Sequence, residues 1–300
     1  MAIIFTFIAA LFFSGLISRT KSVCSGRRGP GIFQPLKEVA RLFRNGSVYS
    51  PTTGWVFKAA PLIYAASVIL ALCVIPFGDI PALISFKGDF VFFAYVLALG
   101  KFFSIIGALD TGSSFEGMGA SREALYSMLA EPAFFLTVGS LALISGYTDF
   151  SDIFAALHPG GLFSYAIAFI AAFVIIVIEL IENSRVPLDD PKTHLELTMI
   201  HEVMILDNSG FDLGLILSAG YLKFAIYTAL VADIFIGGMP MLPAAAVFFA
   251  IQAATAVLIG VIESFIARFR MNHNPQFIFA LTSVAMLMLF AVVMIMANIR

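Results

Sequence analysis

The sequence predicts an all-α, polytopic membrane protein with about eight transmembrane helices and one amphipathic helix on the cytoplasmic surface. Of its 300 residues, 60% are hydrophobic and only 12% are charged, and the mean hydropathy is +0.99. Soluble domains carry about 25% charged residues, so this chain lacks the polar side chains that would cover a water-exposed surface. Disorder is also excluded, because disordered chains are poor in aromatic residues and this one holds 32 phenylalanines.

Eight apolar stretches predict the transmembrane helices, since about 20 apolar residues cross the hydrocarbon core. Within each stretch the apolar residues are continuous rather than alternating, which excludes transmembrane strands. No basic residue precedes the first stretch, so a membrane helix is favoured over a cleaved signal peptide. Because no linker or internal repeat divides the chain, we expect residues 1–300 to form one integral membrane domain. The stretches are 2–17, 59–76, 90–109, 124–147, 161–182, 213–236, 243–267 and 277–298.

The lysines and arginines lie mostly on one side of these predicted helices. Of the 17 basic residues, 13 fall in the segments after the first, third, fifth and seventh helix. Because basic loops stay in the cytoplasm, we expect a multi-pass protein of the cytoplasmic (inner) membrane with both termini on the outer side. The 13 residues are Arg19, Lys21, Arg27, Arg28, Lys37, Arg41, Arg44, Lys58, Arg122, Arg185, Lys192, Arg268 and Arg270.

The residue content argues against several classes of function. A net charge of −2 provides no basic excess for binding nucleic acid. Two cysteines, Cys24 and Cys73, are too few to ligate an iron–sulfur cluster. Since nucleotide-binding, catalytic-triad and metal-ligand motifs are also missing, we expect no catalytic residue, no metal and no cofactor in this chain. Any redox cofactor is then expected in a partner subunit.

A short amphipathic helix is predicted after the first membrane helix. Leu36, Val39, Ala40 and Phe43 repeat at helical spacing and form one apolar face, and Pro35 suits the first turn. A helix of this kind lies in the membrane–water interface. It either rests on anionic lipid or serves as a platform on which another subunit docks.

Two polar segments interrupt the apolar chain on the cytoplasmic side. Glycines and serines within 109–123 predict a loop. After the fifth membrane helix, Asp190 is placed to cap a new helix that runs to about Leu206. His194 and His201 lie on one side of that helix. Because the zinc-binding pattern H-E-x-x-H is incomplete, we interpret them as residues of a hydrogen-bonded interfacial helix rather than as metal ligands.

Seven ionisable residues lie inside the predicted membrane helices. An isolated charge at the bilayer centre costs about 2.5–3.5 kcal/mol on insertion scales, so these side chains require pairing, hydration or neutralisation. They either form structural ion pairs and reach toward the interface, or carry protons. We favour a proton path, because buried carboxylates exchange protons near neutral pH. The residues are Lys101, Glu131, Glu179, Glu182, Lys223, Asp233 and Glu263.

Three motifs of this chain resemble those of a known family. They are Arg28-Gly29-Pro30-Gly31 with the amphipathic helix, Leu109-Asp110-Thr111-Gly112-Ser113 with Gly119-Ala120-Ser121-Arg122-Glu123, and Glu131-Pro132. Together they are similar to the large membrane subunit of formate hydrogenlyase and hydrogenase-4 complexes. That family is related to the subunit of respiratory complex I that joins the peripheral arm to the membrane arm. The resemblance covers about residues 15–275.

The resemblance implies eight transmembrane helices, a docking surface for a peripheral iron–sulfur subunit and a large hydrogenase-like subunit, and an acidic channel toward antiporter-like membrane subunits. Iron–sulfur clusters and a NiFe centre would lie in those partners. The family pattern of glutamate, basic residue, proline and aspartate falls on Glu182, Arg185, Pro187 and Asp189. The complex I form carries several more glutamates in the loop that follows. Their scarcity here favours a hydrogenase-type complex over a quinone-reducing one.

We therefore predict a membrane subunit of a complex I-like energy-converting oxidoreductase, either a membrane-bound NiFe-hydrogenase or a formate hydrogenlyase. It would couple electron transfer to proton or sodium translocation. The alternative is the quinone-site subunit of an NADH:quinone oxidoreductase-like complex, and a third is a passive anchor or a secondary transporter, although no inverted repeat is found. Docking of the peripheral arm is predicted at Arg27, Arg28, Asp110, Arg122, Glu123, Arg185, Asp189, Asp190, Glu196 and Glu202.

Overall fold

The computed structural model describes residues 1–157, 162–190 and 199–299, and among these residues there are helices but no β-strand. Within these described ranges, eight helices are long and apolar enough to cross a membrane, which confirms the predicted all-α, polytopic class. They are α1 (Ala2–Cys24), α3 (Trp55–Cys73), α4 (Asp89–Asp110), α5 (Ser114–Ser145), α7 (Leu162–Glu182), α9 (Gly210–Ile236), α10 (Met241–Phe265) and α11 (Asn274–Ile299).

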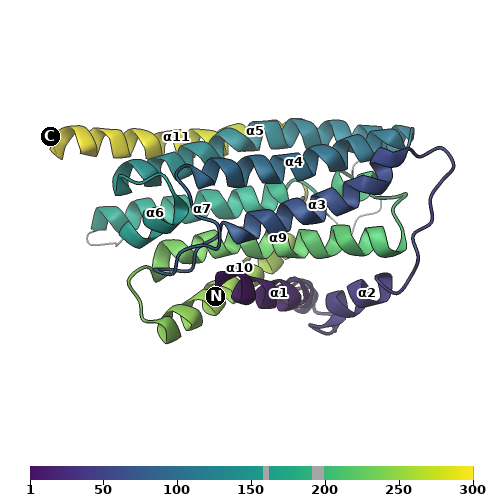
Figure 1. Cartoon of the computed structure of the whole chain (residues 1–300), viewed down its shortest axis with the longest axis horizontal. Coiled ribbons are helices and arrows are strands. Elements are labelled where there is room, and N and C mark those ends of the chain that lie inside the picture. The colour runs from purple at the N-terminus through teal and green to yellow at the C-terminus, as the bar shows by residue number, and fades with distance from the viewer. Residues whose placement is uncertain (158–161, 191–198, 300) are drawn as a thin grey trace.

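The long helices form an elongated bundle (Figure 1). Helix α9 lies at its centre, where it contacts α1, α3, α7 and α10, and most of its length is buried. By contrast, α11 packs mainly on α5 and is largely exposed, as expected for a helix that faces lipid or another subunit. One continuous cluster of buried apolar residues draws on α1, α3, α4, α5, α7, α9, α10 and α11.

Hydrogen bonds between connecting segments define the two ends of the bundle. At one end, Gly54 N–H donates to the Asp110 carboxylate at 2.7 Å and Phe269 N–H donates to the Pro187 carbonyl at 2.9 Å. This end, which also carries α2 (Gln34–Leu42) on the right of Figure 1, is called the basic end because it holds the predicted basic segments. At the opposite end, Gly78 N–H donates to Asp233 at 3.1 Å. The helix directions place both chain termini at this opposite end.

Small residues allow α3 and α4 to approach closely. A Cβ added to Gly107 would lie 2.8 Å from the Ala60 Cβ, and one added to Gly100 would overlap Ser67. Without a hydrophobic driving force inside the bilayer, close backbone contact between small residues is a main source of helix association. This contact holds α4, and with it Lys101, in a defined position beside α3.

The amphipathic helix is present as α2, with Pro35 near its start as predicted. Its buried residues are Pro35, Val39 and Leu42, whereas Ala40 and Phe43 are exposed. The buried face is therefore rotated from the predicted one, because α2 packs against α1 and α9 rather than only on lipid.

Two predictions about the segments at the basic end are wrong. The predicted loop at 109–123 is only a short turn, since α5 begins at Ser114 and continues the membrane helix toward the basic end. The predicted helix to Leu206 is wrong in its described part: Met199 and Ile200 are not helical, His201–Met204 form the short helix α8, and Ile205 to Asp207 form turns, whereas residues 191–198 lie outside the described ranges. Met199 and Ile200 are buried before α8, and α8 packs against α5.

Candidate functional site

A buried group of charges lies at the meeting point of α4, α5, α7 and α9. Lys101 Nζ lies 2.8 Å from Glu182 Oε2 and 3.1 Å from Glu123 Oε1, and it donates a 2.7 Å hydrogen bond to Ser127 Oγ. Lys223 Nζ lies 3.5 Å from the same Glu182 oxygen and also donates to the Glu182 carbonyl. We call Lys101, Glu123, Glu182 and Lys223 the central charge cluster; its formal charges cancel.

Each member of the cluster is positioned by a different helix. Lys101 and Glu123 both lie nine residues from the ends of α4 and α5 at the basic end, or about 14 Å along a helix. Glu182 closes α7 and Lys223 lies midway along α9. Ion pairs below the membrane surface remain stable only when their hydrogen-bonding capacity is met, and Ser127, Ser184 and the Glu182 carbonyl meet it here.

Two cavities meet at this cluster. The larger one, about 510 Å³, lies between α1, α2, α7, α8 and α9 at the basic end. The smaller one, about 60 Å³, lies between α4, α5 and α7. Glu182 lines both, so it lies between a larger cavity with polar and apolar walls and a small space that also reaches Glu131 and Tyr227.

Two further glutamates lie beside the cluster. Glu179 is fully buried and its Oε1 accepts a 2.7 Å hydrogen bond from Thr228, while its Oε2 has no partner in the described part of the chain. A buried carboxylate oxygen without a donor requires a water molecule or a proton. Glu131 is half-buried at the wall of the smaller cavity, next to the helical Pro132. The structure therefore brings Lys101, Glu131, Glu179, Glu182 and Lys223 together.

The other two residues of the predicted proton path lie elsewhere. Glu263 pairs with Arg185 at 3.0 Å and with Lys21 at 3.5 Å, joining α10 to α1 and to the segment after α7. Asp233 is fully buried at the opposite end and accepts the Gly78 N–H. Within the described residues its second oxygen has no partner. Asp233 is thus remote from the central charge cluster and holds the turn after α3.

The predicted docking residues separate into exposed and buried groups. Arg27 and Arg28 are exposed, and Asp190 and Glu202 are partly exposed. Glu123 and Asp189 are buried and pair with Lys101 and Arg268 of this chain. The partly buried Asp110, Arg122 and Arg185 each bond to another segment of the chain. Glu196, like His194, lies outside the described residues.

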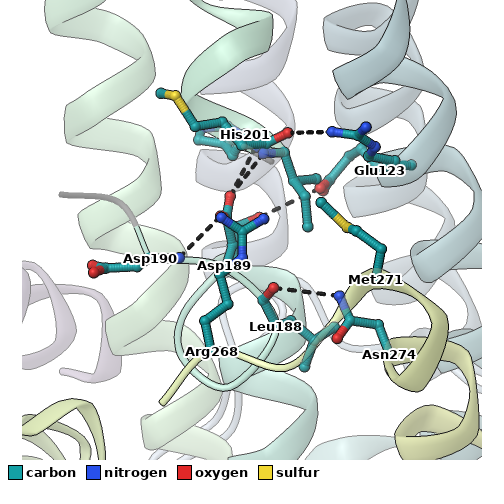
Figure 2. A network of polar contacts seen from close by, with 12 residues as sticks. Glu123, Leu188, Asp189, Asp190, His201, Arg268, Met271 and Asn274 are labelled. Carbon is teal, nitrogen blue, oxygen red and sulfur yellow. Dashed lines mark hydrogen bonds and ion pairs between the residues drawn. The ribbon is translucent and has the colours of Figure 1, made fainter. Parts of the chain in front are cut away.

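Asp189 organises the segment between α7 and α9 (Figure 2). Its carboxylate lies 3.2 Å from the Arg268 guanidinium and accepts N–H groups from Asp190, Ile200 and His201 at 2.9–3.4 Å. Burial raises the pKa of Asp189 above its ordinary value, while Arg268 and these N–H donors oppose that shift. The residue fixes the position of α8, and therefore of His201, relative to α7.

Several partners of these charges are missing from the sequence-based prediction. Lys21 and Arg268 are predicted only as basic residues on one side of the membrane, yet they neutralise Glu263 and Asp189. Thr228 and Ser127 belong to none of the sequence motifs described above. A polar residue inside an apolar stretch is the signal that points to them, but it does not say which carboxylate each one contacts.

The fold and the cluster define a class of protein: a multi-pass helical membrane subunit with paired charges in its interior. The sequence matches the NADH dehydrogenase family over residues 1–296, and the chain belongs to that family. This confirms the resemblance found in the sequence motifs.

Individual relatives agree with this assignment. The chain is 27% identical to formate hydrogenlyase subunit 4 of Escherichia coli (strain K12), with 91% of each chain covered. It is 29% identical to an NADH-quinone oxidoreductase subunit of Rubrobacter xylanophilus, covering 72% of this chain and 66% of that one. The membrane-bound sulfane sulfur reductase, an archaeal respiratory membrane complex, contains a chain of the same fold, with a TM-score of 0.82 and 21% identity over 97% of this chain and 96% of that one.

Proposed function

We propose that this chain is the membrane subunit of an energy-converting hydrogenase or formate hydrogenlyase, in which it docks the peripheral redox arm and carries protons. The observation that carries this proposal is the central charge cluster, in which one carboxylate, Glu182, lines two cavities and pairs with two lysines. The two lysines favour the ionised form of Glu182, so a proton would bind there only when a lysine contact opens, and water in the two cavities would deliver and remove it.

The partners in this proposal supply the redox chemistry. A peripheral iron–sulfur subunit and a large hydrogenase-like subunit would hold the iron–sulfur clusters and the NiFe centre, and antiporter-like membrane subunits would continue the proton path. The likeness to formate hydrogenlyase subunit 4 over 91% of both chains supports this assignment. The whole chain would act as one domain in the cytoplasmic membrane, with its basic end in the cytoplasm and both termini outside.

Replacement of Glu182 tests the proton-carrying role. Glu182→Gln keeps the shape of the side chain but removes its negative charge and its capacity to bind a proton. We expect proton translocation in inside-out vesicles holding the intact complex to fall about tenfold, while hydrogen evolution from reduced methyl viologen persists. Asp152→Asn, at an exposed aspartate of the opposite end, is the matched control and should leave both rates unchanged. Undiminished translocation by an assembled Glu182→Gln complex would contradict the relay.

Charge reversal tests the docking role. Arg27 and Arg28 are exposed at the basic end, so Arg27→Glu with Arg28→Glu should weaken contact with the peripheral subunits without disturbing the fold. We expect those subunits to appear in the soluble fraction after the membranes are washed. Lys87→Glu, an exposed reversal at the opposite end, should release nothing. Full retention of the peripheral subunits by the double variant would exclude these two arginines from the interface.

A quinone-reducing complex is the second candidate. The larger cavity, about 510 Å³, falls within the size range of small-molecule sites. It is bordered by Ile17, Pro30 and Phe224 as well as by charged residues, so an amphiphilic ring could occupy it. Extraction and chemical identification of quinone from the purified complex, together with quinone-dependent turnover, would favour this function over the hydrogenase.

A further inference from the structure

His201 connects two separate cavities. It lines the larger cavity together with Glu182 and Lys223, and it also lines a third cavity of about 20 Å³ beneath α3 and α4. The third cavity is mostly apolar, and its polar lining consists of His201, Ser104 and Asn208. No role follows for His201 from the sequence, where it is only one of two histidines on a predicted interfacial helix.

The third cavity has the size and polarity of a site for one water molecule. About 20 Å³ exceeds the minimum of about 10–15 Å³ that a single water needs. Asn208 Oδ1 is buried and has no hydrogen-bond partner in the described part of the chain. Ser104 Oγ donates to the Gly100 carbonyl at 3.2 Å, which leaves its lone pairs available. A water there would donate one proton to Asn208 Oδ1 and the other either to Ser104 Oγ or to the unprotonated nitrogen of the His201 ring.

Charged groups surround His201 on several elements. Burial lowers the pKa of His201 from its ordinary value, the negative charge of Glu123 opposes that shift, and the lysines of the central charge cluster add to it. The ring is therefore neutral at pH 7, with one nitrogen able to accept a proton and the other able to donate one. The charged groups near it are Lys101 on α4, Glu123 on α5, Glu182 on α7, Lys223 on α9, Glu38 on α2, and Asp189, Arg185 and Glu202 in the segment after α7.

We propose that His201 carries protons between the one-water site formed with Ser104 and Asn208 and the larger cavity beside Glu182. An excess proton that reaches the water passes to one imidazole nitrogen while the other nitrogen releases its own proton toward the larger cavity, so a neutral water molecule remains at the site. The ring ends neutral in its other tautomer, and a flip of the ring restores the starting tautomer. This inference rests on the proposed function, since it adds a second branch to the path that ends at Glu182.

The test compares variants of the intact complex in inside-out vesicles. His201→Gln removes the titrating ring, and Asn208→Leu removes the water's acceptor while keeping a side chain of similar size. We expect His201→Gln to lower proton translocation about tenfold, and Asn208→Leu to lower it less, with methyl viologen-driven hydrogen evolution retained in both. The control is His273→Gln, an exposed histidine at the same end whose ring bonds to Gln276 at 3.0 Å.

The outcomes distinguish failure of this inference about His201 from failure of the proposed function. Wild-type translocation by an assembled His201→Gln complex would overturn the inference, and if Glu182→Gln still lowers translocation in the same preparation, the proposed function stands. Unchanged translocation by both variants would overturn both. If His201→Gln fails to assemble, an experimental map of the wild-type complex decides instead: water density between His201, Ser104 and Asn208 supports the inference, and an empty cavity overturns it.

Discussion

Asp189 shows how a single buried carboxylate stabilises the basic end. It combines an ion pair to Arg268 with three backbone N–H donors, two of them at the start of α8. Removing one partner of a buried pair leaves the other charge uncompensated, which costs more than the pair itself contributes. Asp189 is also the aspartate of the sequence pattern that begins at Glu182. These contacts explain why an aspartate occupies that position of the pattern.

We expect Asp189→Ala to destabilise the protein by about 3–5 kcal/mol, because it leaves Arg268 and three N–H groups without a partner. Asp189→Asn should cost less, since one acceptor oxygen remains for the N–H groups of Ile200 and His201. Thermal unfolding of the complex in detergent, followed by loss of its monodisperse elution peak, measures both. Asp152→Ala, at an exposed position, is the control. Equal losses for Ala and Asn would show that charge rather than hydrogen bonding is decisive.

At the scale of elements, the contact between α5 and α8 positions His201. Gly119 of α5 faces this contact so closely that an added Cβ would lie 2.7 Å from the Ile200 carbonyl and would overlap Val203. The backbone carbonyl cannot rotate away as a flexible side chain would. The glycine in this motif is therefore required for close packing.

Gly119→Ala should displace α8 and destabilise the protein by about 1–3 kcal/mol, the usual cost of overpacking. The displacement should also lower proton translocation, because it moves His201 away from its cavities. Gly139→Ala on the same helix is the matched control, since no atom lies within 4 Å of its added Cβ. Thermal unfolding and translocation assays on both variants measure the difference. Equal behaviour of the two variants would refute the role assigned to this contact.

At the scale of the whole molecule, the two ends differ in charge. The segments at the basic end hold most of the lysines and arginines, and Cys24 lies exposed there at the end of α1. Cys73 is the last residue of α3 and lies at the opposite end of the bundle. The chain therefore contains a natural reporter of its own orientation.

We expect a membrane-impermeant maleimide to label Cys24 in inside-out vesicles and not in right-side-out vesicles, with Cys73 replaced by serine. Lys87→Cys, made in a chain without Cys24 and Cys73, should show the reverse pattern, because Lys87 is exposed at the opposite end. The physical reason is that basic loops are retained in the cytoplasm. Labelling of Cys24 from outside would reverse the proposed orientation.

The sequence alone determined the membrane class, the number of spans, the charge asymmetry of the two ends, the amphipathic helix and the family. These properties depend on local composition and spacing: about 20 apolar residues span a bilayer whatever they pack against. Only the tertiary structure decided which charges meet. It placed Glu123 in the central charge cluster, set Asp233 apart and, within the described residues, limited the helix before Leu206 to His201–Met204. Such pairings join helices far apart in the chain, and close packing of small residues selects them.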